Sequence, residues 1–191
     1  MAVFLVQHAE KVREPGDPGI TDAGRADARA TGRWAARMGV RRVYCSPLLR
    51  SRQTAEVIAE QLSVAPRRLE PIEDPRATER LNWDGTIPFA AFAAEWRRTV
   101  EDRSYTPPFG DSSRTAAARL WALVSEVDAL DGHTVVVTHG GVTVDLLRGL
   151  LGDAALSTAL IQDGVPSCAV TTIDGGTPRT LASTRHLNHR Q

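Results

Sequence analysis

Cysteine is scarce in this chain, long apolar runs are absent, and neither sign of charge is in excess. Cys45 and Cys168 both lie in strand-like runs and outside any Cys-x-x-Cys arrangement, which argues against a disulfide framework or a thiolate metal site and predicts buried, reduced thiols. No run approaches the roughly eighteen apolar residues of a membrane-spanning helix. Basic and acidic residues number 23 each, so net charge provides no general attraction to nucleic acid or to an anionic membrane. Because the amino-terminal apolar run also lacks a basic leader, we expect a cytoplasmic protein. We expect neither nucleic acid nor a membrane as its partner.

The residues that are present indicate an α/β protein. The 191 residues are 42% hydrophobic, which is typical of one soluble domain and predicts a single domain over residues 1–191. Strand-like apolar runs alternate with segments of helical spacing, so the predicted fold class is a three-layer α/β/α sandwich with a mainly parallel sheet. Residues 76–112 interrupt this alternation and predict a small helical cap, with one helix around Phe89 to Glu101. A longer helix is expected from about Ser112 to Leu130.

A further helix is predicted early in the chain, after the Pro/Gly-rich loop of residues 14–19. Thr21 is a suitable N-cap, and the helix is expected to end near Gly39. A strand over Arg42 to Cys45 then leads into a helix that carries Arg50 in its first turn. The side of the first helix expected to face the core consists of Ala23, Ala26, Ala30, Trp34 and Met38.

Two histidines stand where strand-like runs stop. His8 follows the run Ala2 to Val6, and His139 follows the run Thr134 to Thr138. In an open α/β sheet, ligands bind at the carboxyl ends of the strands, so we expect both imidazoles at one edge. The alternative is that each is an ordinary hydrogen-bonded histidine at the end of a strand.

Four stretches, in order, resemble the motifs of the histidine phosphatase superfamily, whose fold is that of the phosphoglycerate mutases. Residues 6–10 resemble its Arg-His-Gly/Ala-Glu motif, and residues 20–24 its Leu-Thr-x-x-Gly turn. Residues 46–55 are close to its Ser-Pro-Leu-x-Arg-Ala-x-Gln-Thr-Ala signature, and residues 137–141 resemble its second histidine motif. One such match is weak evidence, whereas four in order are specific. The resemblance covers nearly the whole chain and implies a member of the small phosphatase branch that needs no metal or cofactor.

The resemblance implies a role for each of several residues. His8 would be the nucleophile, Arg50 and His139 phosphate ligands, and a carboxylate in the cap, best matched by Glu79, the proton donor. This chemistry is physically reasonable, because a neutral imidazole can attack phosphorus while positioned cations stabilise the charged oxygens in the transition state. His139, if protonated, would add a second cation, and backbone N–H groups at Gly140 and Gly141 could approach the same anion. Glu79 would need a pKa raised toward neutrality.

Gln7 departs from the family pattern, which places arginine directly before the nucleophilic histidine. A charge-assisted hydrogen bond contributes about 1.5–3 kcal/mol and a neutral one about 1 kcal/mol, so we expect turnover to be slower by roughly one to two decades. The Gln7 amide can still donate a hydrogen bond to phosphate. Lys11 or Arg13, on the loop after His8, could restore a positive charge, a hypothesis based on proximity in sequence.

Several further residues are ambiguous. Asp84 is the reserve candidate for the proton donor. Ser112 is a possible substrate contact, as is Lys11, although a serine at this position more often caps a helix. The aromatic residues of the predicted cap are expected mainly to pack it onto the sheet, but one or two could line a pocket for the apolar part of a phosphate ester. They are Trp83, Phe89, Phe92, Trp96, Tyr105 and Phe109.

The function that fits best is a phosphomonoester hydrolase that acts through a phosphohistidine on a small phosphorylated substrate. The short cap makes a phosphoglycerate-type mutase less suitable, and a protein phosphohistidine or phosphoserine phosphatase is a further alternative. Gln7 favours a different class, a catalytically weak relative that binds a phosphorylated ligand or a protein partner. A metal hydrolase that uses His8, His139 and a carboxylate ranks last, because Arg50 beside the site would repel a cation. The sequence carries no signal for an oligomeric state.

Overall fold

A computed structural model describes residues 1–63 and 68–187 and contains one mixed sheet in the order β3-β2-β4-β1-β5-β6. Strands β1 to β4 pair in parallel, whereas β5 and β6 pair antiparallel at one edge. The sheet is therefore mainly parallel, and the predicted fold class is confirmed. The strands are β1 (Ala2–Gln7), β2 (Val40–Cys45), β3 (Ile72–Glu73), β4 (His133–Thr138), β5 (Val170–Asp174) and β6 (Thr177–Ser183).

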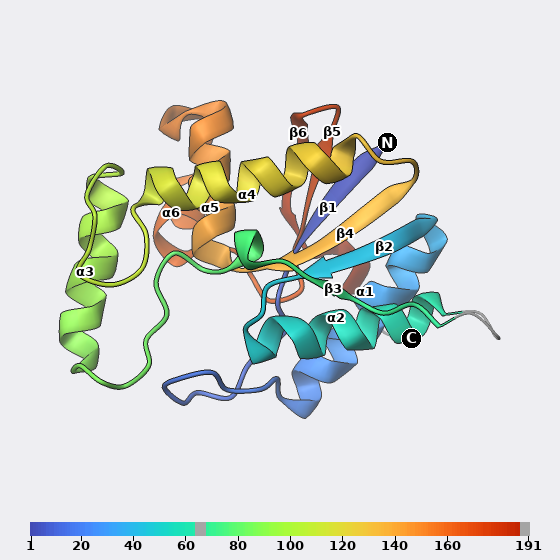
Figure 1. Cartoon of the computed structure of the whole chain (residues 1–191), viewed down its shortest axis with the longest axis horizontal. Helices are drawn as coiled ribbons and strands as arrows, with labels where there is room; N and C mark the ends of the chain where they lie inside the picture. Colours follow the sequence, from blue (N-terminus) through green and yellow to red (C-terminus); the bar gives the residue numbers. More distant parts are fainter. Residues whose placement is uncertain (64–67, 188–191) are drawn as a thin grey trace.

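Helices cover both faces of the sheet, as Figure 1 shows. Helices α1 (Asp22–Arg37) and α2 (Leu49–Leu62) lie on one face, and α4 (Ser113–Asp128) and α5 (Gly140–Leu151) lie on the other. Helix α3 (Phe89–Glu101) stands apart, on the side toward which the parallel strands point. None of the described helices is long and apolar enough to cross a membrane. The shorter helices are α6 (Thr158–Asp163) and the 3-10 turns η1 (Pro75–Ala77), η2 (Asp153–Ala155) and η3 (Arg185–Leu187).

The central strands are apolar on both sides, which is why two helical layers are needed. In β1, Val3 and Leu5 pack into the core under α4 and α5, whereas Phe4 and Val6 pack into the core on the α1 and α2 side. Successive side chains of a strand point to opposite faces, so a continuous apolar run leaves neither face suited to water. The run at β1 therefore requires the sandwich.

The predicted core-facing side of the first helix was wrong for most of its residues. Ala23, Ala26 and Met38 are exposed, whereas Gly24, Ala28, Gly32 and Ala35 are buried. The reason is close packing of α1 on α2: a Cβ atom on Gly32 would lie 2.6 Å from Gln61 Cγ and 3.1 Å from Ile58 Cα. Small residues allow this approach, and hydrophobicity alone does not identify them.

Both cysteines are buried and free, as expected. Cys45 ends β2, but Cys168 lies in a turn before β5 with a φ of 55°, so its predicted place in a strand was wrong. Its backbone N–H donates to Gln7 O at 3.1 Å, which holds this turn against the end of β1. Burial raises the pKa of each thiol to about 12, so both stay protonated at neutral pH.

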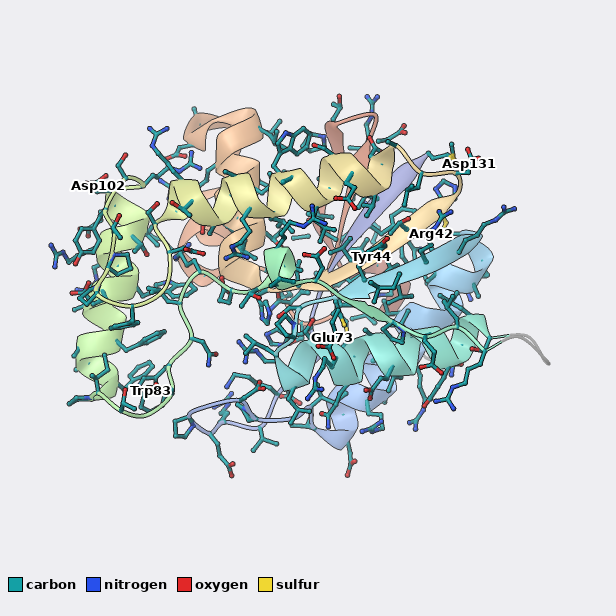
Figure 2. The ribbon with its side chains drawn as sticks, in the orientation of Figure 1. Arg42, Tyr44, Glu73, Trp83, Asp102 and Asp131 are labelled. Atoms are coloured by element: carbon teal, nitrogen blue, oxygen red, sulfur yellow. The ribbon has the colours of Figure 1, made fainter. Side chains whose placement is uncertain are left out.

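The segment between η1 and α4 contains the predicted helix α3 with the expected bounds. Its aromatic residues contact one another: Trp83 meets Phe89 edge to face with ring centroids 5.1 Å apart, and Phe92 stacks on Phe109 at 6.3 Å. Figure 2 shows Trp83 at the foot of α3 and Asp102 at its opposite end. These aromatic residues thus pack against one another within the cap, and their packing onto the sheet stays a prediction.

The register of the central strands brings the two histidines together. Strands β1 and β4 are parallel neighbours in which Gln7 pairs with Thr138. His8 and His139 each follow the end of these strands by one residue, and His8 N donates to Thr138 O at 3.0 Å. Both side chains therefore emerge at the carboxyl edge of the sheet.

Candidate active site

His8 and His139 face each other at this edge, with ring centroids 5.2 Å apart. His8 Nδ1 lies 2.8 Å from Ala9 O, which orients the ring and places its proton on Nδ1. The lone pair of Nε2 then faces Arg50, whose Nε donates to it at 3.3 Å. Burial, and then the charge of Arg50, lowers the pKa of His8 to about 3. His8 is therefore a neutral imidazole with an oriented Nε2 lone pair at any ordinary pH.

Arg50 lies in the first turn of α2, as predicted, and is 4% exposed. Its Nη2 donates to Asn82 Oδ1 at 3.0 Å, and its Nη1 lies 3.7 Å from Asp17 Oδ1. Nη1 is buried and has no hydrogen-bond partner among the described residues. Arg50 thus brings a buried guanidinium, with an unsatisfied donor, directly beside the His8 ring.

His139 is 1% exposed, and its Nε2 lies 2.8 Å from Ser46 Oγ. Ser46 Oγ accepts the N–H of Leu48 at 3.2 Å and can give its own proton to His139, which leaves the ring proton on Nδ1. This Nδ1 is buried without a partner among the described residues. Burial and the neighbouring His8 and Arg50 hold the pKa of His139 well below its ordinary value. The condition that His139 be protonated is therefore not met in the free protein, where the ring is neutral.

The Glu79 carboxylate occupies the N-terminus of α5. Its Oε2 accepts from Gly141 N at 2.9 Å, and its Oε1 accepts from Val142 N and Arg80 N, each at 2.8 Å. In the free protein the Gly141 N–H therefore already donates to Glu79, and its approach to phosphate stays a prediction. The N-terminus of a helix attracts an anion, and here the anion is the chain's own carboxylate.

The surroundings of Glu79 affect its pKa in two opposite directions. Three backbone N–H donors and the charge of Arg80 stabilise the carboxylate, whereas burial destabilises it. Burial is the larger effect and raises the pKa of Glu79 above its ordinary value of 4.5. The direction agrees with the expectation for a group that exchanges a proton near neutral pH.

The Gln7 amide lies beside Gly140: a Cβ atom on that glycine would be 3.6 Å from Gln7 Oε1. Gln7 Oε1 is buried without a partner among the described residues. Of the two proposed compensating cations, Arg13 is exposed, whereas Lys11 is half-buried. Burial and the charge of Arg50 lower the pKa of Lys11, and the charge of Lys11 contributes to the lowered pKa of His8. Lys11 is therefore electrostatically coupled to the site.

Two of the ambiguous residues have structural roles. Asp84 is exposed, and its Oδ1 accepts from Thr86 N at 2.9 Å and Thr86 Oγ1 at 2.6 Å. These bonds lower the pKa of Asp84, which is opposite to what a proton donor needs. Ser112 is the N-cap of α4, with its Oγ accepting from Thr115 N at 3.1 Å. The structure thus favours Glu79 over Asp84 and explains Ser112 as a cap.

Three residues of the site were not singled out from the sequence. Ser46 orients His139, Asn82 holds Arg50, and Asp17 accepts the Leu49 N–H at the start of α2 at 2.8 Å. Ser46 stands in the Ser-Pro motif, which could have marked it. Asp17 and Asn82 are loop residues without periodic spacing, and only the folded chain brings them to Arg50.

Among residues 1–63 and 68–187, no group of three or more histidine, cysteine or carboxylate side chains is arranged to hold a metal ion. The site is instead defined by two neutral histidines, a buried arginine and a carboxylate at a helix N-terminus. Such a set suits a phosphoryl group, because it combines a nitrogen nucleophile with donors for anionic oxygens.

Comparisons with known proteins agree with this class of site. The sequence model of the histidine phosphatase superfamily (branch 1) matches residues 4–184. A 2,3-bisphosphoglycerate-dependent phosphoglycerate mutase of Bartonella henselae is 31% identical over 165 residues, which cover 78% of this chain and 79% of the relative. A probable phosphoglycerate mutase of Erwinia tasmaniensis is 25% identical over 96% of this chain and 89% of its own length. The chain therefore belongs to the histidine phosphatase superfamily.

Solved structures show the same fold. A mycobacterial glucosyl-3-phosphoglycerate phosphatase in complex with inorganic phosphate superposes with a TM-score of 0.74, at 23% identity over 97% of this chain and 98% of the other. A phosphoserine phosphatase variant of Entamoeba histolytica in complex with phosphoserine has a TM-score of 0.68, at 21% identity over 97% and 98% of the two chains. At these identities the likeness establishes the fold.

Proposed function

We propose that this protein is a phosphomonoester hydrolase that acts through a phosphohistidine on a small phosphorylated substrate. The observation that carries the proposal is the set of unsatisfied polar atoms around His8. Arg50 Nη1, His139 Nδ1 and Gln7 Oε1 are all buried without a hydrogen-bond partner among the described residues, although such groups are nearly always paired. A bound phosphoryl group would satisfy the two donors, and rotation of the Gln7 amide would present its NH₂ as a third.

The first step forms a bond from His8 Nε2 to phosphorus and breaks the bond from phosphorus to the ester oxygen. Glu79 in its protonated form gives that oxygen a proton, so the alcohol leaves neutral. In the second step Glu79 takes a proton from water, the water oxygen bonds to phosphorus, and the bond to His8 breaks. Inorganic phosphate is released, and His8 and Glu79 return to their starting states.

Arg50 supplies the positive charge that this transfer needs. Its guanidinium is held by Asn82 and Asp17, and both contacts lie on Nη atoms. These contacts hold the guanidinium with its Nε directed at His8 Nε2, where the transferred group would sit. Positioned cations contribute most of the stabilisation in such transfers, since the nonbridging oxygens carry the charge.

The proposal favours hydrolysis over mutase chemistry, although named relatives include both phosphoglycerate mutases and phosphatases. A mutase must keep the phosphoryl group from water, whereas this chain has a short cap containing a single α-helix among its described residues. The second candidate, a weakly active protein that binds a phosphorylated ligand or partner, is favoured by Gln7, which stands where the sequence resemblance predicts arginine.

The test measures phosphate release from an aryl phosphate by chelator-treated wild type, His8→Ala and His186→Ala. We expect turnover by the wild type, loss of turnover in His8→Ala, and little change in the control His186→Ala, whose imidazole bonds to Thr31 on α1. Rapid acid-free quenching should trap labelled phosphate on the wild type and the control but not on His8→Ala. Turnover that survives His8→Ala, or that stops after chelation, would contradict the proposal.

A further inference from the structure

Directly after Glu79, the side chain of Arg80 enters the interior and forms an ion pair there. Arg80 is 2% exposed and Asp145, on α5, is 0% exposed. Arg80 Nη1 donates to both Asp145 oxygens at 2.7 Å. Asp145 stands four residues after Gly141, so the two residues lie on the same face of α5. The Gly141 N–H donates to the Glu79 carboxylate.

This ion pair connects the segment that carries Glu79 with three other parts of the molecule. Ser113, at the start of α4, donates its hydroxyl to Asp145 Oδ1 at 2.7 Å. Arg103, which follows α3, donates to Ser113 Oγ at 3.2 Å and to Asp145 O at 2.8 Å. The Arg80 guanidinium lies 3.9 Å from the centroid of the Trp96 ring on α3. Arg80 is thus fixed from several directions, and the Glu79 backbone with it.

Stability alone does not explain two charges in this position. Desolvation of a buried ion pair offsets most or all of its attraction, and well-packed apolar residues often stabilise a fold as well or better. An ion pair produces an electric field around it, whereas apolar residues do not. Arg80 and Asp145 have opposite effects on the charge of Glu79: Arg80 favours the carboxylate, and Asp145 opposes it.

We propose that Arg80 and Asp145 are positioning residues for Glu79, which hold its carboxyl group on the N-terminus of α5 and balance the charge around it so that it can exchange a proton. The inference rests on the proposed role of Glu79. Asp145 offsets the charge of Arg80, which would otherwise keep Glu79 ionised and unable to protonate a leaving group.

The other charged groups near Glu79 are already paired, so the ion pair determines the balance of charge around its carboxyl group. From α2, Arg50 is coupled to Glu79 electrostatically, but it is already held by Asp17 and Asn82. From α4, Arg119 donates to Thr78 O at 2.9 Å and is paired with Asp111 at 2.8 Å. His8, after β1, is neutral. Arg80 and Asp145 are the charged groups that affect the pKa of Glu79 most, and they act in opposite directions.

The test follows the carboxyl carbon of Glu79 by ¹³C NMR as pH is varied, with its signal assigned by its loss in Glu79→Gln. Asp145→Asn leaves the Arg80 charge uncompensated, so the titration midpoint of Glu79 should fall by about one pH unit. The double variant R80M/D145V removes both charges, and the midpoint should rise. Opposite displacements are the signature of an electrostatic role, because simple loosening of the cap would move both variants the same way.

The matched control is Arg148→Met, also on α5. Arg148 pairs with Asp153 at 2.7 Å and donates to Val100 O of α3 at 2.9 Å, so it ties the cap to α5 without facing Glu79. We expect no displacement in this variant. A titration midpoint equal to that of the wild type in both Asp145→Asn and R80M/D145V would overturn the inference. Failure of both variants to fold would also overturn it, because the ion pair would then serve stability. Because the titration needs no substrate, its result is separate from whether the wild type hydrolyses phosphate esters.

Discussion

At the scale of single residues, Gln7 stands directly before His8, where the sequence resemblance predicts an arginine. The Gln7 amide lies next to Gly140, and its buried Oε1 has no hydrogen-bond partner among the residues that the structure describes. A glutamine donates neutral hydrogen bonds to a phosphate, whereas an arginine donates charge-assisted ones that are about twice as strong. The remaining positive charge comes from Arg50, with Lys11 coupled to it. Slow chemistry with retained phosphate binding is the expected consequence.

Gln7→Arg should therefore raise kcat/KM for an aryl phosphate by about tenfold to a hundredfold, because one more guanidinium would stabilise the transferring oxygens. The measurement is steady-state kinetics of the two purified proteins. In the Gln7→Arg background, Lys11→Ala should cost less activity than in the wild type, since Lys11 would no longer be the second cation. Equal rates for the wild type and Gln7→Arg would show that the glutamine does not limit turnover.

The pKa directions at His8 and Glu79 predict a pH profile. His8 must be neutral to attack, so kcat/KM should rise as pH increases through about 3. Glu79 must be protonated to act as an acid, so kcat/KM should fall as pH rises through its raised pKa, which is above 4.5. The profile is measured with correction for the second ionisation of the ester.

In Glu79→Gln the falling limb should disappear, and kcat should drop by about 10²- to 10⁴-fold for an alkyl phosphate. The loss should be smaller for an aryl phosphate, whose leaving oxygen needs less help from an acid. A wild-type falling limb in Glu79→Gln would assign that limb to another group, with Asp84→Asn as the comparison variant.

At the scale of elements, the N-terminus of α5 organises the site. Its preceding residue is His139, its first residues hold the Glu79 carboxylate, and Asp145 one turn later holds Arg80. To bind Glu79, the backbone at the start of α5 must pass very close to the side chains packed against it. A Cβ atom on Gly141 would lie 2.5 Å from Glu79 Oε1 and 2.6 Å from the Trp96 ring. Glycine is required here for space rather than for an unusual φ.

Gly141→Ala should displace Glu79 or Trp96 and lower kcat by at least about tenfold, since misplacement of a reacting group by 1 Å can cost about 10² in rate. Gly149→Ala, on the same helix, is the control: its Cβ would meet only Arg103 Nη2, at an ordinary 3.6 Å. That change should stabilise the protein by about 0.5–1 kcal/mol, as alanine does in helix interiors. The readouts are kcat and the midpoint of thermal unfolding. Equal activity in the two variants would show that the close approach at Gly141 does not matter.

At the scale of the whole molecule, the proposed anion site lies at the carboxyl edge of the sheet, in a chain whose basic and acidic residues are equal in number. Ligand binding to the native state stabilises it by RT ln(1 + [L]/Kd), which is about 2.7 kcal/mol at a hundred times Kd. For a chain of this size, such stabilisation corresponds to a rise in Tm of roughly 5–10 °C.

Inorganic phosphate at saturating concentration should therefore raise the Tm of the chelator-treated protein by this amount, as measured by calorimetry. His8→Ala should keep most of the rise, because the nucleophile carries no charge, and Arg50→Met should lose most of it. Sulfate at equal ionic strength controls for general salt effects. A protein that binds phosphate this way yet releases none from esters would belong to the binding class that Gln7 favours.

Much of this molecule was predictable from local pattern. The apolar runs of β1 and β4 predict buried parallel strands, since both faces of each are apolar, and the four ordered motifs predicted the superfamily. The prediction for α1 was mostly wrong, because its buried face is made of Gly24, Ala28 and Gly32, which pack by shape. The placement of Cys168 was wrong because a turn with positive φ interrupts an otherwise strand-like run.

The sequence by itself determined the class of fold, the family, and the residue types available for phosphoryl transfer, because periodicity and ordered motifs are properties of neighbours along the chain. Only the tertiary structure decided how those residues act on one another. Burial keeps His139 neutral, and the Glu79 carboxylate binds the N-terminus of α5. Folding also brings Asp17 and Asn82 to Arg50, and Asp145 to Arg80. Charge states and hydrogen bonds depend on distance and burial, and these exist only once residues far apart in the sequence have been packed together.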